Sequence, residues 1–203
     1  MKTYAALYAP PIKKMTDENK ALIYLGYRGS DIPEDVRGLI DFCKKKVDET
    51  AEEKYVYKKF RLARDDDGIS FAGTGLYVVS RNLSDVLKDC EEAYLLAVTL
   101  GIGADTLIRK YMVSEPEKGV LLDSLFSVKA DKLADKAQQE IEGLCKRSLS
   151  FRFSPGYGDL PLECQNDIID ILDTRKRIGL FVTSSQMMTP TKSVTAILGV
   201  KNI

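Results

Sequence analysis

The chain has 203 residues, of which 44% are hydrophobic and 30% are charged, as is usual for a globular protein of one or two domains. Thirty basic residues balance thirty acidic ones, so charge gives no reason to expect nucleic acid or an anionic membrane as a partner. No apolar run approaches the ~20 residues of a membrane span, and the first residues are too interrupted for a signal peptide. We therefore expect a cytoplasmic protein.

Histidine and cysteine limit the chemistry further. The chain has no histidine, which removes imidazole as a general base or a metal ligand. Cys43, Cys90, Cys145 and Cys164 are scattered and form no C-x-x-C motif. We expect reduced thiols and no zinc site, with a reactive thiol as the less favoured alternative.

The first quarter of the chain is predicted to be helical. A helix is expected over residues 17–25, between a polar cap and a glycine. A second helix is expected to begin at Ser30 or Asp31 and to continue through Val47 with helical spacing of apolar residues. Residues 1–50 are thus a candidate helical subregion.

Two strands are predicted next, over residues 55–62 and 69–71. Residues 64–68 read Arg-Asp-Asp-Asp-Gly between them. Three aspartates could suggest calcium, but the closing glutamate of an EF-hand loop is missing, so we expect a turn.

A short helix is expected to begin at Ser84, and the apolar run at residues 93–100 predicts a buried strand. The run ends in Gly101-Ile-Gly103, with helical sequence after it. A dinucleotide-binding loop is disfavoured, because Thr106 stands where the third glycine belongs.

A long helix is predicted over residues 116–146, with Pro116 in its first turn. Asp131 and Asp135 lie four residues apart and share one face of this helix. They are either part of a solvated face or part of a site. The apolar stripe comprises Val120, Leu121, Leu125, Val128, Leu133, Ala134, Ala137 and Ile141.

Residues 152–161, Arg-Phe-Ser-Pro-Gly-Tyr-Gly-Asp-Leu-Pro, combine a charge with turn residues. Arg152 offers a planar fork of donors suited to a carboxylate. Gly156 and Gly158 permit positive φ on either side of Tyr157, whose ring is then aimed by a stiff loop. The loop suits a small zwitterionic ligand; the alternative is a turn with a surface arginine.

The C-terminal part is predicted to contain a helix over 161–172 and strands over 180–183 and 193–198. Met187 and Met188, in the loop between these strands, are expected to fill the core rather than contact a cofactor. Helix and strand signals alternate without βαβ regularity, which favours the α+β class.

The order of motifs resembles the C-terminal activation domain of cobalamin-dependent methionine synthase, in the form of its free-standing members. The motifs are R-x-x-x-G-Y at 152–157, a helix, I-G-L-x-V-T at 178–183, M-x-P at 188–190 and S-V-T at 193–195. The opening at 21–29 and the Ala-Asp-Lys-Leu-Ala-Asp segment at 130–135 also resemble this family.

This resemblance implies one unit over residues 1–203, with a mostly antiparallel sheet flanked by helices. It also implies an S-adenosylmethionine-binding protein that assists reductive remethylation of cobalamin on a separate methionine synthase or corrinoid methyltransferase. A flavodoxin or ferredoxin would be the reductant. Without histidine the chain cannot supply the Asp-x-His-x-x-Gly cobalt ligand, so we expect cobalamin to arrive on the partner.

The resemblance also assigns ligand-binding residues, with no catalytic residue and no metal ligand. Arg152 would pair the carboxylate of S-adenosylmethionine, and Asp135, in place of a family glutamate, would take the ammonium or a ribose hydroxyl. Backbone groups from Ser154 to Gly156 would meet the adenine. Tyr157 would stack or hydrogen-bond.

Two departures keep alternatives open. Gly158-Asp159 stands where methionine synthase has Pro-Ala, and no further strand with aromatic ligand contacts follows before Ile203. The rival interpretations are a docking or corrinoid-handling module of the same fold that has lost its ligand, and an unrelated small-molecule enzyme on the same scaffold. Whether the chain is an enzyme stays open.

Overall fold

The computed structural model describes residues 34–202, so the predicted helix at 17–25 and the predicted start of the second helix lie outside the described residues. The helices are α2 (Glu34–Thr50), α3 (Arg81–Leu87), α4 (Ile102–Ser114), α5 (Pro116–Cys145), α6 (Cys164–Ile171) and α7 (Thr174–Ile178). The strands are β1 (Lys54–Arg64), β2 (Ile69–Phe71), β3 (Tyr77–Val78), β4 (Cys90–Thr99), β5 (Phe181–Val182), β6 (Met188–Thr189) and β7 (Ser193–Lys201).

Five of the strands form one antiparallel sheet in the order β3-β2-β1-β4-β7, and β5 pairs with β6 in a separate hairpin. The middle of the sheet is in regular register, with Tyr57 of β1 opposite Leu96 of β4 and Leu96 opposite Ala196 of β7. The predicted α+β class with a mostly antiparallel sheet flanked by helices is confirmed.

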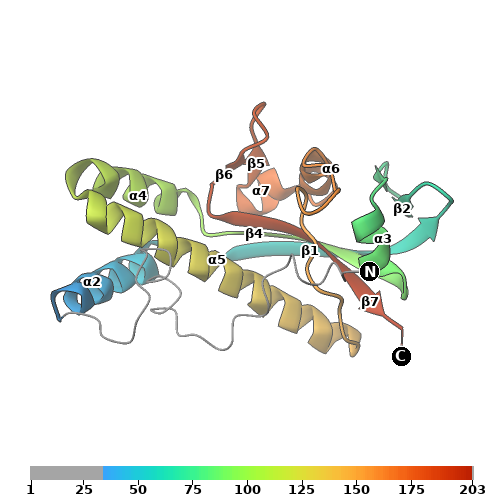
Figure 1. Cartoon of the computed structure of the whole chain (residues 1–203), viewed down its shortest axis with the longest axis horizontal. Coiled ribbons are helices and arrows are strands. Elements are labelled where there is room, and N and C mark those ends of the chain that lie inside the picture. Colours follow the sequence, from blue (N-terminus) through green and yellow to red (C-terminus); the bar gives the residue numbers. More distant parts are fainter. Residues whose placement is uncertain (1–33, 203) are drawn as a thin grey trace, which may run out of the picture.

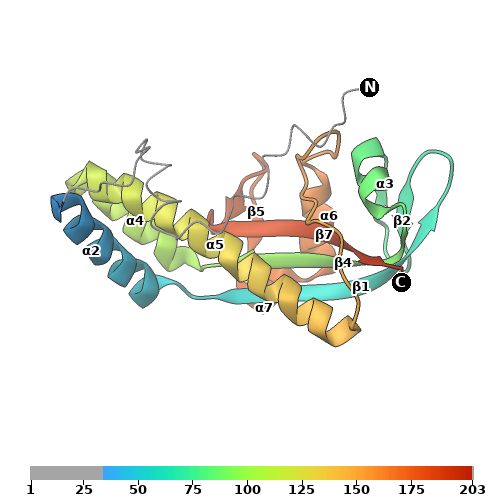
Figure 2. The same ribbon diagram turned by 60° about the horizontal axis from the view of Figure 1, so that its bottom comes forward.

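The apolar run of β4 is explained by helices on both faces of the sheet. Its side chains alternate, because successive residues of a strand point to opposite faces. Tyr94, Leu96 and Val98 join one core with α2, α4 and α5. Ala93, Leu95 and Ala97 join a second core with α3, α6 and α7. Figures 1 and 2 show α5 crossing one face of the strands obliquely, with α2 and α4 beside its N-terminal half.

The long helix is confirmed as α5, and the predicted apolar stripe packs mostly inside. Leu121, Leu125, Leu133 and Ile141 are buried in the first core. Val120 was expected there and instead is 42% exposed.

The start of α3 was predicted wrongly. Helix α3 begins at Arg81, and Ser80 is its N-cap, whose hydroxyl accepts a 3.0 Å hydrogen bond from the backbone N–H of Leu83. Ser84 lies inside the helix, and its hydroxyl donates to the carbonyl of Ser80. Serine is a favoured N-cap residue, so the sequence alone offers both Ser80 and Ser84. The structure selects Ser80, whose backbone is extended, whereas Ser84 has already entered the helix.

Several short elements differ from the sequence prediction in their bounds or were not predicted at all. The helix predicted over 161–172 begins at Cys164, and α7, β3 and β6 were not predicted. Met187 is exposed, so its expected role in the core was wrong, whereas Met188 is half-buried and packs against the second core. The 64–68 turn is present: the carboxylate of Asp65 accepts hydrogen bonds from the backbone N–H groups of Asp67 and Gly68.

Across residues 34–202, no helix combines the length and the apolar character needed to cross a bilayer.

Candidate functional site

Helix α5 supplies one wall of the candidate site. Asp131, Asp135 and Gln138 occur at spacings of four and three residues, which places them on one face of the helix. They belong to the polar side of α5, opposite the stripe that packs in the first core. The sequence prediction that both aspartates share a face is confirmed.

The second wall is an extended segment that runs beside β7. Ser150 donates its backbone N–H to Gly199, and Phe153 and Ile197 exchange two backbone hydrogen bonds of 3.0 and 2.8 Å. The side chain of Phe153 is 1% exposed and anchors the segment in the second core. Its neighbour Arg152 then extends toward α5.

Arg152 and Asp135 form an ion pair across the two walls. The guanidinium Nη1 donates to Oδ1 of Asp135 and also lies 3.4 Å from Oε1 of Gln138. The side chain of Arg152 is 23% exposed and that of Asp135 is 56% exposed. In this structure, therefore, Arg152 and Asp135, which the resemblance assigns to different groups of a ligand, contact each other.

The loop after Arg152 is a stiff double turn. The N–H of Tyr157 donates to the carbonyl of Ser154 at 3.0 Å, and Gly156 and Leu160 are joined by a 2.9 Å hydrogen bond. Gly156 has φ of 85°, in the left-handed region that favours glycine. The ring of Tyr157 packs edge-on against that of Phe153, with centroids 6.0 Å apart. The predicted aiming of Tyr157 by the loop is thus present.

These walls enclose a hollow of about 280 Å³, which we call the Arg152 pocket. It is lined by Asp131, Asp135, Gln138, Phe151, Arg152, Ser154, Tyr157 and Val194. Four of the five predicted ligand residues line it, and the fifth, Gly156, shapes the loop without lining the pocket.

Four lining residues were not predicted as ligand residues from the sequence, and one of them, Asp131, was named only as part of either a solvated face or a site. Gln138 could have been found, because it continues the Asp131–Asp135 face by one turn. Phe151 directly precedes the motif arginine, but its exposed aromatic ring carries no motif signal. Val194 lies in the S-V-T motif at 193–195, but its place at the pocket depends on β7 running beside the segment that carries Arg152.

The unusual Gly158-Asp159 pair fastens the loop to the start of α3. The carboxylate of Asp159 accepts hydrogen bonds from the hydroxyl of Ser80 and from the backbone N–H groups of Arg81 and Asn82. Burial alone would raise the pKa of Asp159, but these three hydrogen bonds outweigh it and hold the pKa below its usual value. Asp159 therefore has a structural role, in joining the loop to the start of α3.

The cysteines lie away from the Arg152 pocket. All four are free, and Cys43, Cys90 and Cys164 are buried. Burial raises the pKa of Cys43 to about 11 and raises the pKa values of Cys90 and Cys164. These three thiols are therefore protonated and poorly nucleophilic at neutral pH. Within the described part of the chain, no three His, Cys, Asp or Glu side chains gather as a metal site.

Comparisons with known proteins place the fold. No family model matches the chain, and no curated protein matches it. Among solved structures, the crystal structure of the MetH reactivation domain bound to AdoHcy superimposes with a TM-score of 0.70. The match has 16% sequence identity and covers 89% of this chain and 72% of that one. The chain therefore has the fold of the MetH reactivation domain.

Proposed function

We propose that this protein binds S-adenosylmethionine in the Arg152 pocket and assists the reductive remethylation of cobalamin on a separate protein. The observation that carries the proposal is the Arg152–Asp135 pair, which sits with Ser154 and Tyr157 at one pocket. Support comes from the fold, since the MetH reactivation domain was solved with AdoHcy. On this proposal the whole chain acts as one unit.

Binding would occur by exchange of charge partners. The amino-acid end of S-adenosylmethionine carries a carboxylate and an ammonium side by side. If it enters between the two walls, Arg152 exchanges Asp135 for the carboxylate, and Asp135 turns to the ammonium or a ribose hydroxyl. Each protein charge keeps an opposite partner, so neither is left desolvated and unpaired, which would be costly.

The size of the pocket suits only part of the ligand. Its volume of about 280 Å³ is near the lower end, roughly 300 Å³, of the range for small-molecule sites. We infer that the amino-acid end fills the pocket. The adenosine then lies along the loop, near the backbone of Ser154–Gly156 and the exposed rings of Phe151 and Tyr157. The electron-rich face of Tyr157 would also suit the sulfonium.

The chemistry of methyl transfer to cob(I)alamin fits a chain without histidine. The cobalt is itself the nucleophile, so no general base is needed, and the protein's task is to position the methyl donor. Cobalamin would be carried by a methionine synthase or another corrinoid methyltransferase in the cytoplasm. A flavodoxin or ferredoxin would supply the electron that reduces cob(II)alamin.

A second candidate is a docking or corrinoid-handling module of the same fold that binds no S-adenosylmethionine. One observation favours it: Arg152 and Asp135 already neutralise each other, so the pocket is not held open by an unpaired charge. Only a binding measurement separates the two candidates.

Isothermal titration calorimetry of the full chain with S-adenosylmethionine and with S-adenosylhomocysteine tests the proposal. We expect measurable binding of both molecules, because they share the amino-acid end and the adenosine. If no heat of binding is measured at millimolar S-adenosylmethionine, the proposal fails, and the docking or corrinoid-handling module becomes the favoured function. A pull-down that recovers a corrinoid protein, with and without S-adenosylmethionine, then tests the partner and its dependence on ligand.

A further inference from the structure

The arginine of the Arg152 pocket has a neutral partner, Gln138, beside its acidic one. Gln138 lies one turn after Asp135 on α5 and is half-buried, and its Oε1 accepts a 3.4 Å hydrogen bond from Nη1 of Arg152. Asp135 binds the same nitrogen. Within residues 34–202, Nε and Nη2 of Arg152 take part in no hydrogen bond or ion pair. The edge of the guanidinium that suits a two-bond contact with a carboxylate is therefore not used by those residues.

Glu142 fixes which end of the Gln138 amide faces the arginine. Its Oε1 accepts a hydrogen bond from Nε2 of Gln138 at 3.4 Å and another from the backbone N–H of Leu149 at 3.3 Å. If the amide were reversed, its NH₂ would face the guanidinium, which has only donors, and its carbonyl would face the carboxylate, which has only acceptors. The network therefore admits one orientation, with the carbonyl toward Arg152.

This network joins α5 to the extended segment beside β7 at two points. Leu149 and Phe153, at the two ends of the segment, each form a bridge with β7. Glu142 contacts the first end, and Gln138 contacts Arg152 next to the second. The place of the guanidinium relative to α5 is therefore set by groups whose backbones belong to the helix and to the edge of the sheet.

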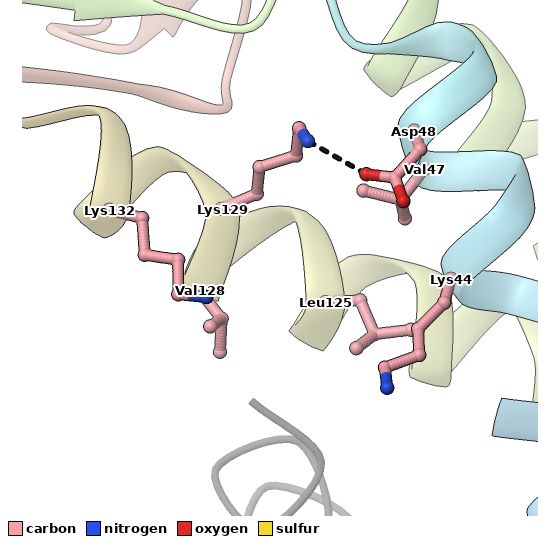
Figure 3. A pocket seen from close by; sticks show the side chains of 7 residues that line it. All are labelled: Lys44, Val47, Asp48, Leu125, Val128, Lys129 and Lys132. Atoms are coloured by element: carbon pink, nitrogen blue, oxygen red, sulfur yellow. Dashed lines mark hydrogen bonds and ion pairs between the residues drawn. The ribbon is translucent and has the colours of Figure 1, made fainter. Parts of the chain in front are cut away.

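Lys129, another cation of α5, shows a different set of partners. Its side chain is 23% exposed, as is that of Arg152. Figure 3 shows it reaching from α5 to Asp48 of α2, and a second acid, Glu53, lies 3.3 Å from its Nζ. Two carboxylates meet the single charge of Lys129. Arg152 instead contacts one carboxylate and one neutral amide in the described part of the chain, and the amide holds the guanidinium without neutralising it.

We propose that Gln138, oriented by Glu142, positions the guanidinium of Arg152 to receive a carboxylate, and that the neutrality of Gln138 lets the carboxylate of the ligand bind there. When Asp135 turns to the ammonium of S-adenosylmethionine, Gln138 keeps its bond to Nη1, and Nε and Nη2 stay directed at the carboxylate. A negative charge at position 138 would compete with the ligand and would face the like charge of Glu142. The statement about the ligand rests on the proposed function, whereas the positioning of Arg152 does not.

The positioning is measured without ligand, by ¹⁵N relaxation of the Nε–H group of Arg152 in the full chain. The signal is assigned by its loss in Arg152→Ala. Gln138→Met keeps an unbranched side chain of similar length and removes the carbonyl, so it should lower the order parameter of this group below about 0.6, the range of flexible groups. Gln139→Met, at the exposed next position of α5, is the matched control and should leave it unchanged. An order parameter that is the same in Gln138→Met and in wild type would overturn the positioning role.

Two ligands that differ in one group test the role of neutrality. Decarboxylated S-adenosylmethionine lacks the carboxylate of S-adenosylmethionine and keeps the ammonium, the sulfonium and the adenosine. Calorimetry of the full chain gives the ratio of the two affinities, which in wild type should favour S-adenosylmethionine by roughly ten- to a hundredfold. Gln138→Glu should lower this ratio by about tenfold, because the new carboxylate competes for the guanidinium.

The control for this measurement is Gln139→Glu, which adds the same charge at the exposed next position and should leave the ratio as in wild type. Two results would contradict the role of neutrality: equal weakening of both ligands by Gln138→Glu, or an equal fall of the ratio in Gln139→Glu. If wild type binds neither ligand, the proposed function fails and the statement about the ligand fails with it. The relaxation of Arg152 still decides in that case whether Gln138 positions the arginine.

Discussion

Gly158 and Asn82 approach so closely that a Cβ atom on Gly158 would lie 2.1 Å from Oδ1 of Asn82. The same Asn82 oxygen accepts a hydrogen bond from the backbone N–H of Asp159 at 3.2 Å. The loop that carries Tyr157 thus packs directly against the start of α3, and position 158 has no room for a side chain unless Asn82 moves.

Gly158→Ala should destabilise the protein by about 1–3 kcal/mol. The φ of Gly158 is 56°, where an L-residue is disfavoured by roughly 1–2 kcal/mol, and the contact with Asn82 adds to that cost. Urea unfolding measures the change. The control is Gly143→Ala in α5, where a Cβ would meet no atom within 4 Å and a gain of about 0.5–1 kcal/mol is expected. Equal effects at both positions would contradict the role assigned to the contact.

Asp159→Ala should cost about 1 kcal/mol at neutral pH, comparable to the loss of a helix cap. The pKa of Asp159 is lowered in the folded protein, so the ionised carboxylate stabilises the fold. That contribution is complete above the unfolded value of about 3.9 and is lost as pH falls through the lower folded value. Urea unfolding at pH 7, 5 and 3 should therefore show the difference from wild type shrinking on acidification.

Asp66→Ala, at an exposed position of the β1–β2 turn, is the matched control for Asp159→Ala and should change stability little at any pH. A penalty for Asp159→Ala that stays constant down to pH 3 would mean that the hydrogen bonds do not depend on the charge.

Glu140 joins α5 to β1 through two tyrosines. Its carboxylate accepts hydrogen bonds from the hydroxyls of Tyr55 and Tyr57, the second at 2.7 Å. The bond to Glu140, followed by burial, raises the pKa of Tyr57 to about 12. Because the folded value exceeds the unfolded value of about 10, the bond stabilises the protein fully below pH 10 and is lost as pH rises toward 12.

Glu140→Gln should move the ionisation of Tyr57 toward pH 10, because the amide no longer repels a phenolate. Alkaline titration of phenolate absorbance, with Tyr57→Phe subtracted to isolate this tyrosine, measures the midpoint. A midpoint that remains near 12 in Glu140→Gln would assign the raised pKa to burial alone.

The parts of the site that the sequence predicted are those with local causes. The glycines of the 152–161 loop predict positive φ at Gly156 and Gly158, and both have positive φ in the structure. Helix α5 follows from its 3.6-residue apolar period. Asp131 and Asp135 share a face for the same reason.

The parts that were missed depend on residues far apart in the chain. Ser80 caps α3, and its hydroxyl is held by Asp159, 79 residues away, which no local pattern indicates. Arg152 and Asp135 were each predicted as ligand groups. Their pairing with each other requires α5 to pass near the segment that runs beside β7, and this depends on how the sheet and helices pack.

The isolated protein should not retain cobalamin. The expectation follows from the absence of histidine, which leaves the chain without the usual lower ligand to cobalt. Absorbance of protein incubated with cob(II)alamin and then dialysed is the measurement. Stoichiometric corrinoid after dialysis would show that the chain carries the cofactor itself and does not depend on a partner for it.

Arg152→Ala should weaken binding of S-adenosylmethionine by about 1.5–3 kcal/mol, or roughly ten- to a hundredfold, through loss of a charge-assisted bond to the carboxylate. Arg152→Lys should restore part of the affinity, since an ammonium cannot make the planar two-bond contact. Tyr157→Phe should cost less, because the ring and its packing on Phe153 remain. Calorimetry measures all three variants, with Arg109→Ala at an exposed position of α4 as the control.

The fold should survive Arg152→Ala, since the side chain makes a partly exposed ion pair with Asp135, and such pairs contribute about 0–1 kcal/mol. Measuring both the stability and the affinity of Arg152→Ala therefore distinguishes a ligand-binding role from a structural role. If the variant is as stable as wild type but has lost affinity for S-adenosylmethionine, Arg152 binds the ligand. Unfolding of the variant would instead mean that Arg152 holds α5 against the loop, and the pocket would then be a structural joint. A variant that removes the partner checks this assignment. Asp135→Asn leaves the guanidinium of Arg152 without its anionic partner, so acetate, which has a carboxylate alone, should bind to this variant more tightly than to the wild-type protein.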